Sequence, residues 1–313
     1  MQKLILLYLF VFSTHIVPAQ TMATKLAAAV QQLEADPQFR YGTVGLCVVD
    51  ALTGKVVYAH NAQTGLAAAS TQKIFTSVAA FELLGPVYRY RTRIGYDGAV
   101  ENGVLKGNLH IVGYGDPTLG SWRWNETKEE VILAKIAGAL KQNHITKITG
   151  QVFINDAAFS GQPIPGGWIW DDMGNYYGAG CWAVNWHENQ YELHLQPGTE
   201  EGDTTRIVKT VPDLQGAVLV NQITTGKKGS GDNGYIYLPP YSLLGFTQGT
   251  VPPGAAPFVI AGAFPDGPLQ FAHALEKCFD QQHIVVEGAF GLRAGGVRLR
   301  RGAERCLPVG ALR

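Results

Sequence analysis

The apolar residues of this chain are spaced first for a helix and a hairpin, then mainly for short strands. Helical spacing predicts a helix over residues 25–33, and strand patterns at 43–50 and 56–60 predict a hairpin. From about residue 90, short strand patterns broken by Gly and Asn predominate. These predicted strands cover residues 90–96, 104–112, 147–154, 191–196, 206–211 and 234–238. One predicted helix, residues 128–142, interrupts them.

A further predicted helix, residues 68–84, is strongly apolar. Its large apolar residues recur at helical spacing with small residues between them: Ile74, Phe75, Val78, Phe81 and Leu84. Gly85 and Pro86 are expected to end it. Because Lys73 and Glu82 are the only charged residues in this segment, we expect the helix to be buried.

The hydrophobic pattern near the end of the chain indicates that the chain returns to the first domain. A strand is predicted at 258–263 and a helix at 269–280, after the long series of short strands. We therefore predict an α+β chain in which residues 20–89 and 256–291 form one split domain. Residues 90–255 are predicted to be a mainly-β domain inserted into it.

Composition and the first residues indicate an exported globular protein. The chain has 313 residues, 46% of them hydrophobic, and a formal net charge of zero, which gives no reason to expect a nucleic-acid partner. Residues 1–19 contain Lys3, an apolar run and Val-Pro-Ala before Gln20, as secretory signal peptides do. The run is too short to span a bilayer, so we expect a periplasmic location without a stable membrane anchor.

The cysteines predict neither a metal site nor a disulfide framework. Four cysteines are scattered along the chain without a Cys-x-x-Cys pair: Cys47, Cys181, Cys278 and Cys306. Cys47 lies in an apolar strand pattern and is expected to be a buried thiol. The sequence therefore predicts no metal and no cofactor.

Ser70 and Lys73 are the candidate catalytic residues. Positions three apart return to nearly the same face of a helix, so the Lys73 ammonium is predicted to reach the Ser70 hydroxyl. A serine becomes a nucleophile when a neighbour takes its proton, and a lysine in apolar surroundings can do so. Backbone N–H groups at the helix start would favour the negative charge that develops in acyl transfer.

The same two residues also have a structural interpretation, as a helix N-cap and a solvated lysine. With 7 Ser and 13 Lys in the chain, chance alone gives about 0.3 Ser-x-x-Lys matches, so the motif by itself favours the structural interpretation. The apolar surroundings of Lys73 favour the catalytic one.

Three further segments follow Ser70-Thr71-Gln72-Lys73 along the chain. They are Gly-Tyr-Gly-Asp-Pro-Thr-Leu at 113–119, Asn-Asp-Ala-Ala-Phe at 155–159, and a Trp-rich stretch at 167–173 that is followed by Tyr176-Tyr177 and Val184-Asn185. In this order, and with the β-rich insertion, they resemble the class C low-molecular-mass penicillin-binding proteins. This is the serine-type D-Ala-D-Ala carboxypeptidase and endopeptidase family (peptidase S13). The resemblance covers residues 25–290 and implies a penicillin-binding/β-lactamase-like fold.

Asp116 and Asp156 have different expected roles. Asp116 lies between Gly115 and Pro117, where it is expected to hold a tight turn through backbone N–H groups. Asp156 follows a predicted strand, where it would either point into a cleft or cap an Asx-turn. The resemblance implies that Asp156 helps to bind the amino end of a peptide substrate. Four aromatic residues either line a cleft or, as their density favours, belong to the core: Trp168, Trp170, Tyr176 and Trp182.

The two other motifs of the family, Ser-x-Asn and Lys-Thr-Gly, do not occur. The nearest match to the second is Lys227-Lys228-Gly229, inside the predicted insertion. The similarity fades at about Gly291, and residues 292–313 hold six of the twelve arginines and no lysine. We therefore expect a family member cut short, whose last residues are either a basic surface tail or a frameshift product.

The resemblance implies a serine peptidase that acts on peptidoglycan stem peptides. Ser70 would attack the D-Ala carbonyl, Lys73 would accept the proton, and β-lactam antibiotics would acylate the same serine. The missing motifs predict impaired catalysis, because loss of one oxyanion donor costs about 10² to 10³ in rate. One alternative is a non-catalytic peptidoglycan-binding or degenerate protein, which the missing motifs favour. The other is a serine β-lactamase, which the long insertion disfavours.

Overall fold

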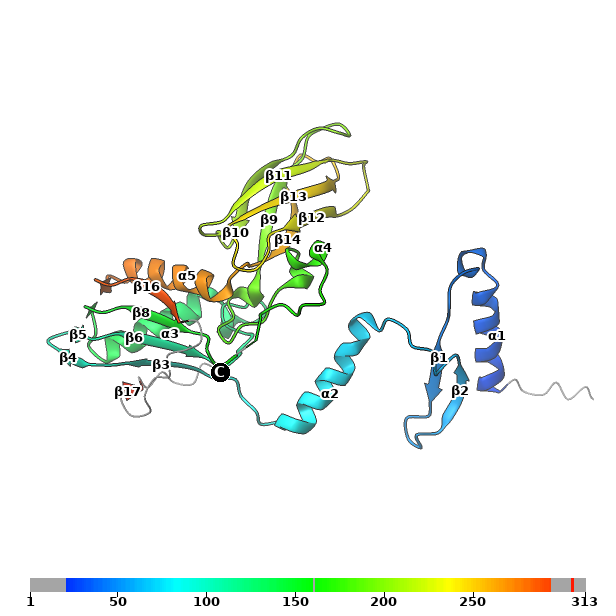
Figure 1. Ribbon diagram of the computed structural model, residues 1–313, viewed down its shortest axis with the longest axis horizontal. Coiled ribbons are helices and arrows are strands. Elements are labelled where there is room, and N and C mark those ends of the chain that lie inside the picture. The colour runs from blue at the N-terminus through cyan, green and yellow to red at the C-terminus, as the bar shows by residue number, and fades with distance from the viewer. Residues whose placement is uncertain (1–20, 160, 294–304, 307–313) are drawn as a thin grey trace, which may run out of the picture. The chain divides into compact units, whose positions relative to one another are not determined.

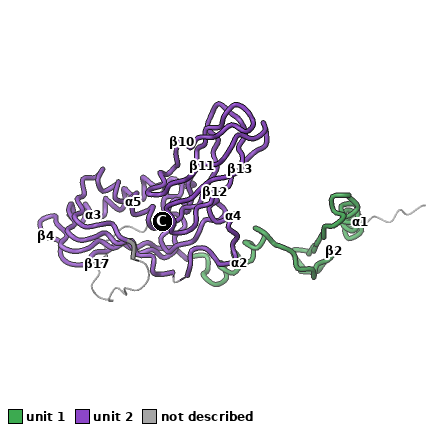
Figure 2. Tube along the Cα trace, turned by 45° about the horizontal axis from the view of Figure 1, so that its top comes forward, with its two compact units in different colours: residues 1–87 green, residues 88–313 purple. Residues whose placement is uncertain are grey.

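The computed structural model describes residues 21–159, 161–293 and 305–306. The chain divides into two compact units, residues 1–87 and 88–313 (Figure 2). The predicted signal peptide, residues 1–19, lies outside the described residues. Among the helices that the structure describes, none is both long and apolar enough to cross a membrane.

The first unit consists of helices and one hairpin (Figure 1). Its elements are α1 (Met22–Glu34), η1 (Pro37–Phe39), β1 (Leu46–Val49), β2 (Val56–His60), η2 (Ala69–Thr71) and α2 (Gln72–Leu84). The hydroxyl of Thr21 accepts a hydrogen bond from the Thr24 N–H at 3.2 Å and so caps α1. His60 Nε2 lies 2.8 Å from Glu34 Oε1, which ties β2 to the end of α1.

The first unit buries little of its surface. Of residues 21–87, Val30 alone is buried. β1 and β2 form a two-stranded antiparallel sheet, and burial alternates along β1. Cys47 lies on the exposed side of this strand, so the expectation of a buried thiol is wrong. A hairpin with one helix beside it is too thin to enclose both faces of its strands.

One part of the second unit consists of two sheets and two helices. The five-stranded sheet has the order β16-β8-β6-β3-β17, and the four-stranded sheet has the order β15-β7-β5-β4. The bounds are β3 (Thr92–Tyr96), β4 (Ala99–Glu101), β5 (Val104–Lys106), β6 (Leu109–Gly113), β7 (Lys147–Ile148), β8 (Val152–Asn155), β15 (Val285–Val286), β16 (Phe290–Arg293) and β17 (Arg305–Cys306). α3 (Glu129–Gln142) and α5 (Gly267–Gln281) contact each other, and Ile111, Ile136 and Leu275 lie in the shared core.

A strand-rich part of the same unit holds two three-stranded sheets. Their orders are β10-β9-β14 and β11-β13-β12, and β11 and β13 run parallel. The bounds are β9 (Gln190–Gln196), β10 (Arg206–Val211), β11 (Val218–Thr225), β12 (Asn233–Tyr237), β13 (Leu244–Val251) and β14 (Phe258–Ala263). Short helices lie in the connections: η3 (Asn125–Thr127), α4 (Trp170–Met173), η4 (Tyr176–Gly178) and η5 (His187–Asn189). Helices together with sheets that mix parallel and antiparallel strands confirm the predicted α+β class.

The last elements differ from the predicted domain organisation. The sequence pattern groups residues 256–291 with 20–89, whereas in the structure they belong to the second unit. β14 pairs with β9, α5 packs on α3, and β16 extends the sheet beside β8. The apolar faces of these elements are therefore covered within the second unit. Of the predicted tail 292–313, only residues 292–293 and 305–306 are described.

Candidate active site

The structure brings Ser70 and Lys73 together. Ser70 lies in the 3₁₀ turn η2 directly before α2, and Lys73 lies in the first turn of α2. Lys73 Nζ donates a hydrogen bond to Ser70 Oγ at 3.0 Å. The three-residue spacing thus places an amine beside the hydroxyl, as predicted from helical geometry.

The residue before Ser70 has an uncommon backbone conformation. Ala69, the preceding residue, has a φ of 45°, in the left-handed region that residues other than glycine seldom adopt. Thr71 is the N-cap of α2, but its hydroxyl donates to the Ala68 carbonyl and makes no capping bond. The first N–H groups of α2 therefore have no side-chain cap, and such a helix end favours a nearby negative charge.

α2 is not buried, which contradicts the prediction from its composition. Residues 61–84 are exposed throughout, and Ile74, Phe75 and Phe81 are 64%, 69% and 60% exposed. The low charge of the helix does not bury it, because no other element described within residues 21–87 covers its apolar side. Lys73 therefore meets solvent.

Asp116 has the turn-holding role that the sequence predicted. Its side chain is buried, and Oδ1 accepts hydrogen bonds from the Thr118 N–H at 2.9 Å and the Thr118 hydroxyl at 2.7 Å. Gly115, with a φ of 84°, begins the turn. The amide of Asn185 donates to the Asp116 carbonyl at 3.2 Å. The segments 113–119 and 184–185, both noted in the sequence, are therefore neighbours in the fold.

Asp156 does not make the Asx-turn that was one of its two interpretations. That turn is made by Asn155, whose Oδ1 accepts a hydrogen bond from the Ala157 N–H at 3.0 Å. Asp156 is half-buried, and burial raises the pKa of its carboxyl group. Asp266, the N-cap of α5, is buried close by, and its pKa is raised by burial and, in smaller part, by the charge of Asp156. The two carboxylates would both be stabilised by a cation.

The four aromatic residues separate into core and surface. Trp182 is 3% exposed and belongs to the core. Trp168, Trp170 and Tyr176 are 38%, 44% and 50% exposed, so the core interpretation is wrong for these three. Trp168 lies just before α4, Trp170 lies on α4, and Tyr176 lies on η4. These elements are too short to bury a large ring.

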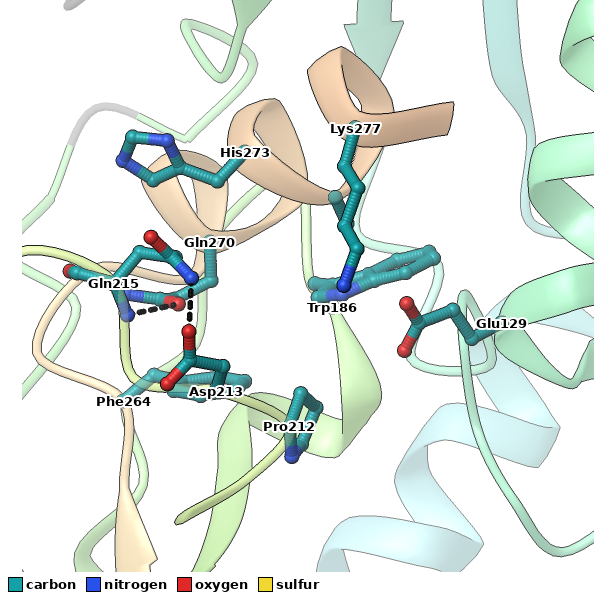
Figure 3. Close-up of a pocket in the computed structure, with 10 residues that line it drawn as sticks. Glu129, Trp186, Pro212, Asp213, Gln215, Phe264, Gln270, His273 and Lys277 are labelled. Carbon is teal, nitrogen blue, oxygen red and sulfur yellow. Dashed lines mark hydrogen bonds between the residues drawn. The ribbon is translucent and has the colours of Figure 1, made fainter. Parts of the chain in front are cut away.

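Small cavities lie in the second unit, and the sequence did not predict them. One of these cavities has a volume of about 60 Å³ and is shown in Figure 3. Trp186, Glu129 and Lys277 line one side of it, and Asp213 and Gln215 line the opposite side. It has room for a few waters and no more. Burial raises the pKa of Glu129, and the charge of Glu130 adds to this, whereas Lys277 lowers it.

A larger cavity lies beside the turn of Asp116. It has a volume of about 470 Å³, and its lining includes Thr118, Arg123, Trp124 and Glu188. Arg123 and Glu188 form an ion pair across 65 residues of sequence, so no local pattern could have indicated it. Nowhere in residues 21–159, 161–293 and 305–306 do three or more His, Cys, Asp or Glu side chains form a possible metal site.

Residues 26–295 match the family model described as the D-Ala-D-Ala carboxypeptidase 3 (S13) family. The chain belongs to this family. The match includes Ser70, Lys73, Asp116 and Asp156. It confirms the resemblance that the sequence motifs indicated.

Two curated proteins that are similar to this S13 chain are named as D-alanyl-D-alanine carboxypeptidases. It is 27% identical over 282 residues to a D-alanyl-D-alanine carboxypeptidase of Actinomadura sp. (strain R39), covering 88% of this chain and 50% of that protein. It is 29% identical over 164 residues to D-alanyl-D-alanine carboxypeptidase DacB of Haemophilus influenzae, covering 52% of this chain and 32% of that protein. The chain spans half or less of the length of these relatives.

Solved structures show the same fold. Penicillin binding protein 4 (dacB) from Haemophilus influenzae matches with a TM-score of 0.66 at 22% identity, over 86% of this chain and 56% of that one. The same protein complexed with a novel β-lactam matches with a TM-score of 0.58 at 20% identity, over 85% and 55%. The penicillin-binding fold implied by the sequence is therefore confirmed for the S13 chain.

Proposed function

We propose that this protein is a serine D-Ala-D-Ala carboxypeptidase/endopeptidase that acts on peptidoglycan peptides through an acyl-enzyme at Ser70. The observation that carries the proposal is the 3.0 Å hydrogen bond from Lys73 Nζ to Ser70 Oγ at the start of α2. Membership of the S13 family supports this use of the pair.

The reaction divides into two steps. In the first, Ser70 Oγ attacks the carbonyl carbon of the penultimate D-Ala, and its proton passes to the Lys73 amine, which acts as the base. The tetrahedral intermediate collapses, the peptide C–N bond breaks, and Lys73 returns the proton to the leaving amine. In the second step, water adds to the ester with Lys73 again as base. The peptide acid is released and Ser70 is restored.

The N-terminus of α2 would stabilise the oxyanion of both steps. The start of this helix lies next to Ser70 and has no side-chain cap, and although the Gln72 N–H donates to carbonyls of the preceding turn, the positive end of the helix dipole remains there. The 313 residues contain neither Ser-x-Asn nor Lys-Thr-Gly.

Asp156 would bind a free amino group of the substrate peptide. Its carboxylate is half-buried, and the pKa of Asp266 is raised mainly by burial and in smaller part by the charge of Asp156. An ammonium group placed there would offset both negative charges. Residues 1–19, with their signal-peptide pattern, support export to the periplasm, where such peptides occur. β-Lactams would acylate Ser70 because they carry an activated amide in place of the D-Ala-D-Ala bond.

The test is release of D-Ala from a peptide ending in D-Ala-D-Ala, with Ser70→Ala as control. Release that depends on Ser70 is the expected result. If a folded protein releases no D-Ala but hydrolyses nitrocefin with steady turnover, the β-lactamase alternative is correct. If it does neither and still binds the peptide, the protein is a non-catalytic binder.

A further inference from the structure

Two tryptophans are exposed on one short loop of the second unit. Trp122 is 44% exposed and Trp124 is 55% exposed, with Arg123 between them. Tryptophan has one of the largest apolar surfaces to bury, so two exposed indoles within three residues are costly to leave in water. Such a surface feature is typical of a binding site.

The loop that carries these rings is held rigidly. Arg123 Nε and Nη2 donate to Glu188 Oε1 and Oε2 at 2.7 and 3.0 Å, which is a bidentate ion pair. The Ser121 hydroxyl donates to Glu188 Oε1 at 2.7 Å, and the Thr127 hydroxyl donates to the Ser121 carbonyl at 2.9 Å. A ligand would therefore meet indoles that are already in place, at little cost in conformational entropy.

Glu188 itself lies in a segment whose backbone conformation is strained. His187, Glu188 and Asn189 have φ values of 50°, 54° and 56°, and each residue in this region costs on the order of 1 kcal/mol. The buried Asn189 amide holds the segment, because Nδ2 donates to the Gly180 carbonyl at 2.9 Å and to Asn185 Oδ1 at 2.7 Å. The Trp122 ring lies 4.7 Å from the His187 ring, so the strained segment also supports the indole.

A cavity lies directly beside this loop. Its volume is about 470 Å³, and Trp124, Arg123 and Glu188 belong to its lining, together with Tyr90, Thr118 and Gln190. Sites for small molecules range over about 300–1,000 Å³. The cavity therefore has room for a ligand of one or two rings.

The charges beside the cavity cancel. Burial alone would raise the pKa of Glu188, but hydrogen bonds from Arg123 and Ser121 hold it below its ordinary value, so the carboxylate stays ionised. Arg123 is thereby neutralised and offers no free charge to a phosphate or a carboxylate. A neutral ligand fits this lining best.

We propose that residues 121–125 and this cavity bind a neutral oligosaccharide of β-linked N-acetylated amino sugars. The C–H face of a pyranose ring matches the electron-rich indole face of Trp124, which lines the cavity. Trp122 instead packs against the ring and charge that hold the loop: the His187 ring at 4.7 Å and the Arg123 guanidinium at 5.5 Å. The hydroxyl and N-acetyl groups at its edge match the polar lining that Thr118 and Gln190 provide. The proposal rests on the proposed function, since the stem peptides of peptidoglycan are attached to a glycan of this chemistry.

The test is calorimetric titration of the purified chain with a β-1,4-linked N-acetylglucosamine tetramer that carries no peptide. Saturable binding with a Kd on the order of 0.1–1 mM is expected. Trp124→Ala should weaken binding at least about tenfold, a loss of roughly 1.4 kcal/mol. Trp170→Ala is the matched control, because Trp170 is 44% exposed, comparable to the 55% of Trp124, but lies on α4 and outside the lining of the cavity.

Absence of saturable binding, or equal losses in the two variants, would overturn the proposal. Saturation-transfer NMR on the unmodified chain needs no variant: transfer from indole protons to sugar protons supports the site, and its absence rejects it. Labelling of Ser70 by a fluorescent penicillin in the same preparation separates the two proposals. Label without glycan binding rejects only the glycan site, and glycan binding without label rejects only the peptidase.

Discussion

Lys73 Nζ donates a hydrogen bond to Ser70 Oγ at 3.0 Å, across a single turn at the start of α2. If this amine is the base, Lys73→Ala should slow acylation of Ser70 by a β-lactam about 10²- to 10⁴-fold. Both side chains are exposed, so the substitution should leave the fold intact. Stopped-flow or quenched labelling measures the rate, and Lys55→Ala, another exposed lysine of the first unit, is the control. Equal acylation rates in the wild type and Lys73→Ala would remove Lys73 from the mechanism.

Glu129 should destabilise the protein at neutral pH. Its pKa is raised, mainly by burial, so the folded state favours the neutral acid and ionisation costs stability. Glu129→Gln should therefore raise Tm at pH 7.5. The gain should disappear at pH values below the ordinary pKa of a glutamate, where both states carry the proton. Thermal melts at the two pH values make the comparison, with exposed Glu126→Gln as control. A gain that is the same at both pH values would rule out ionisation as its cause.

Gly113 should tolerate no side chain. A Cβ at this position would lie 2.1 Å from the Ala183 carbonyl oxygen and 2.5 Å from Val184 Cγ2, so Gly113→Ala should cost about 1–3 kcal/mol or more. For Gly138, inside α3, no atom outside the local helix backbone lies within 4 Å of a Cβ, and Gly138→Ala should stabilise the helix by about 0.5–1 kcal/mol. Urea unfolding of both variants checks the contrast. Opposite signs are expected, and a loss of stability in both variants would contradict the packing around Gly113.

Asn189 should be needed for the strained segment beside the larger cavity. Asn189→Ala removes two donated hydrogen bonds and the acceptor for the Trp186 N–H at 3.1 Å, so it should cost about 1–3 kcal/mol for the buried groups left unpaired. Asn102 is the control, since it has a φ of 49° but is exposed, and its replacement by Ala adds only backbone strain. Equal losses in the two variants, measured by chemical denaturation, would show that the hydrogen bonds contribute nothing.

Local patterns predicted most of the longer elements of this chain. The predicted strands 104–112 and 147–154 are wrong as single strands, because each is two strands in different sheets: β5 and β6, and β7 and β8. The short strands β4, β15 and β16 were not predicted. Helical spacing placed α3 within one residue of its bounds, and Gly85, with a φ of 77°, ends α2 as expected. β11 and β13 were missed. Polar residues such as Asn221 and Thr247 interrupt their apolar pattern, and these two side chains bond to each other at 2.8 Å in the sheet. A partner across the sheet is not visible in a local window.

The candidate site was predictable only where its residues are close in sequence. The Ser70–Lys73 contact follows from helical geometry, and the hold of Asp116 on Thr118 follows from turn geometry. The pair of Arg123 and Glu188 depends on the fold, because 65 residues separate them. The burial of α2 was predicted wrongly, since apolar composition says that a helix needs a partner and does not show that one is present.

Covalent labelling with a fluorescent penicillin, on the wild-type chain and on Ser70→Ala, tests the acyl-enzyme proposal most directly. Near-stoichiometric label on the wild type and none on the variant is the predicted result. A wild-type chain that is folded by circular dichroism and takes up no label would contradict it, and so would label that survives in Ser70→Ala.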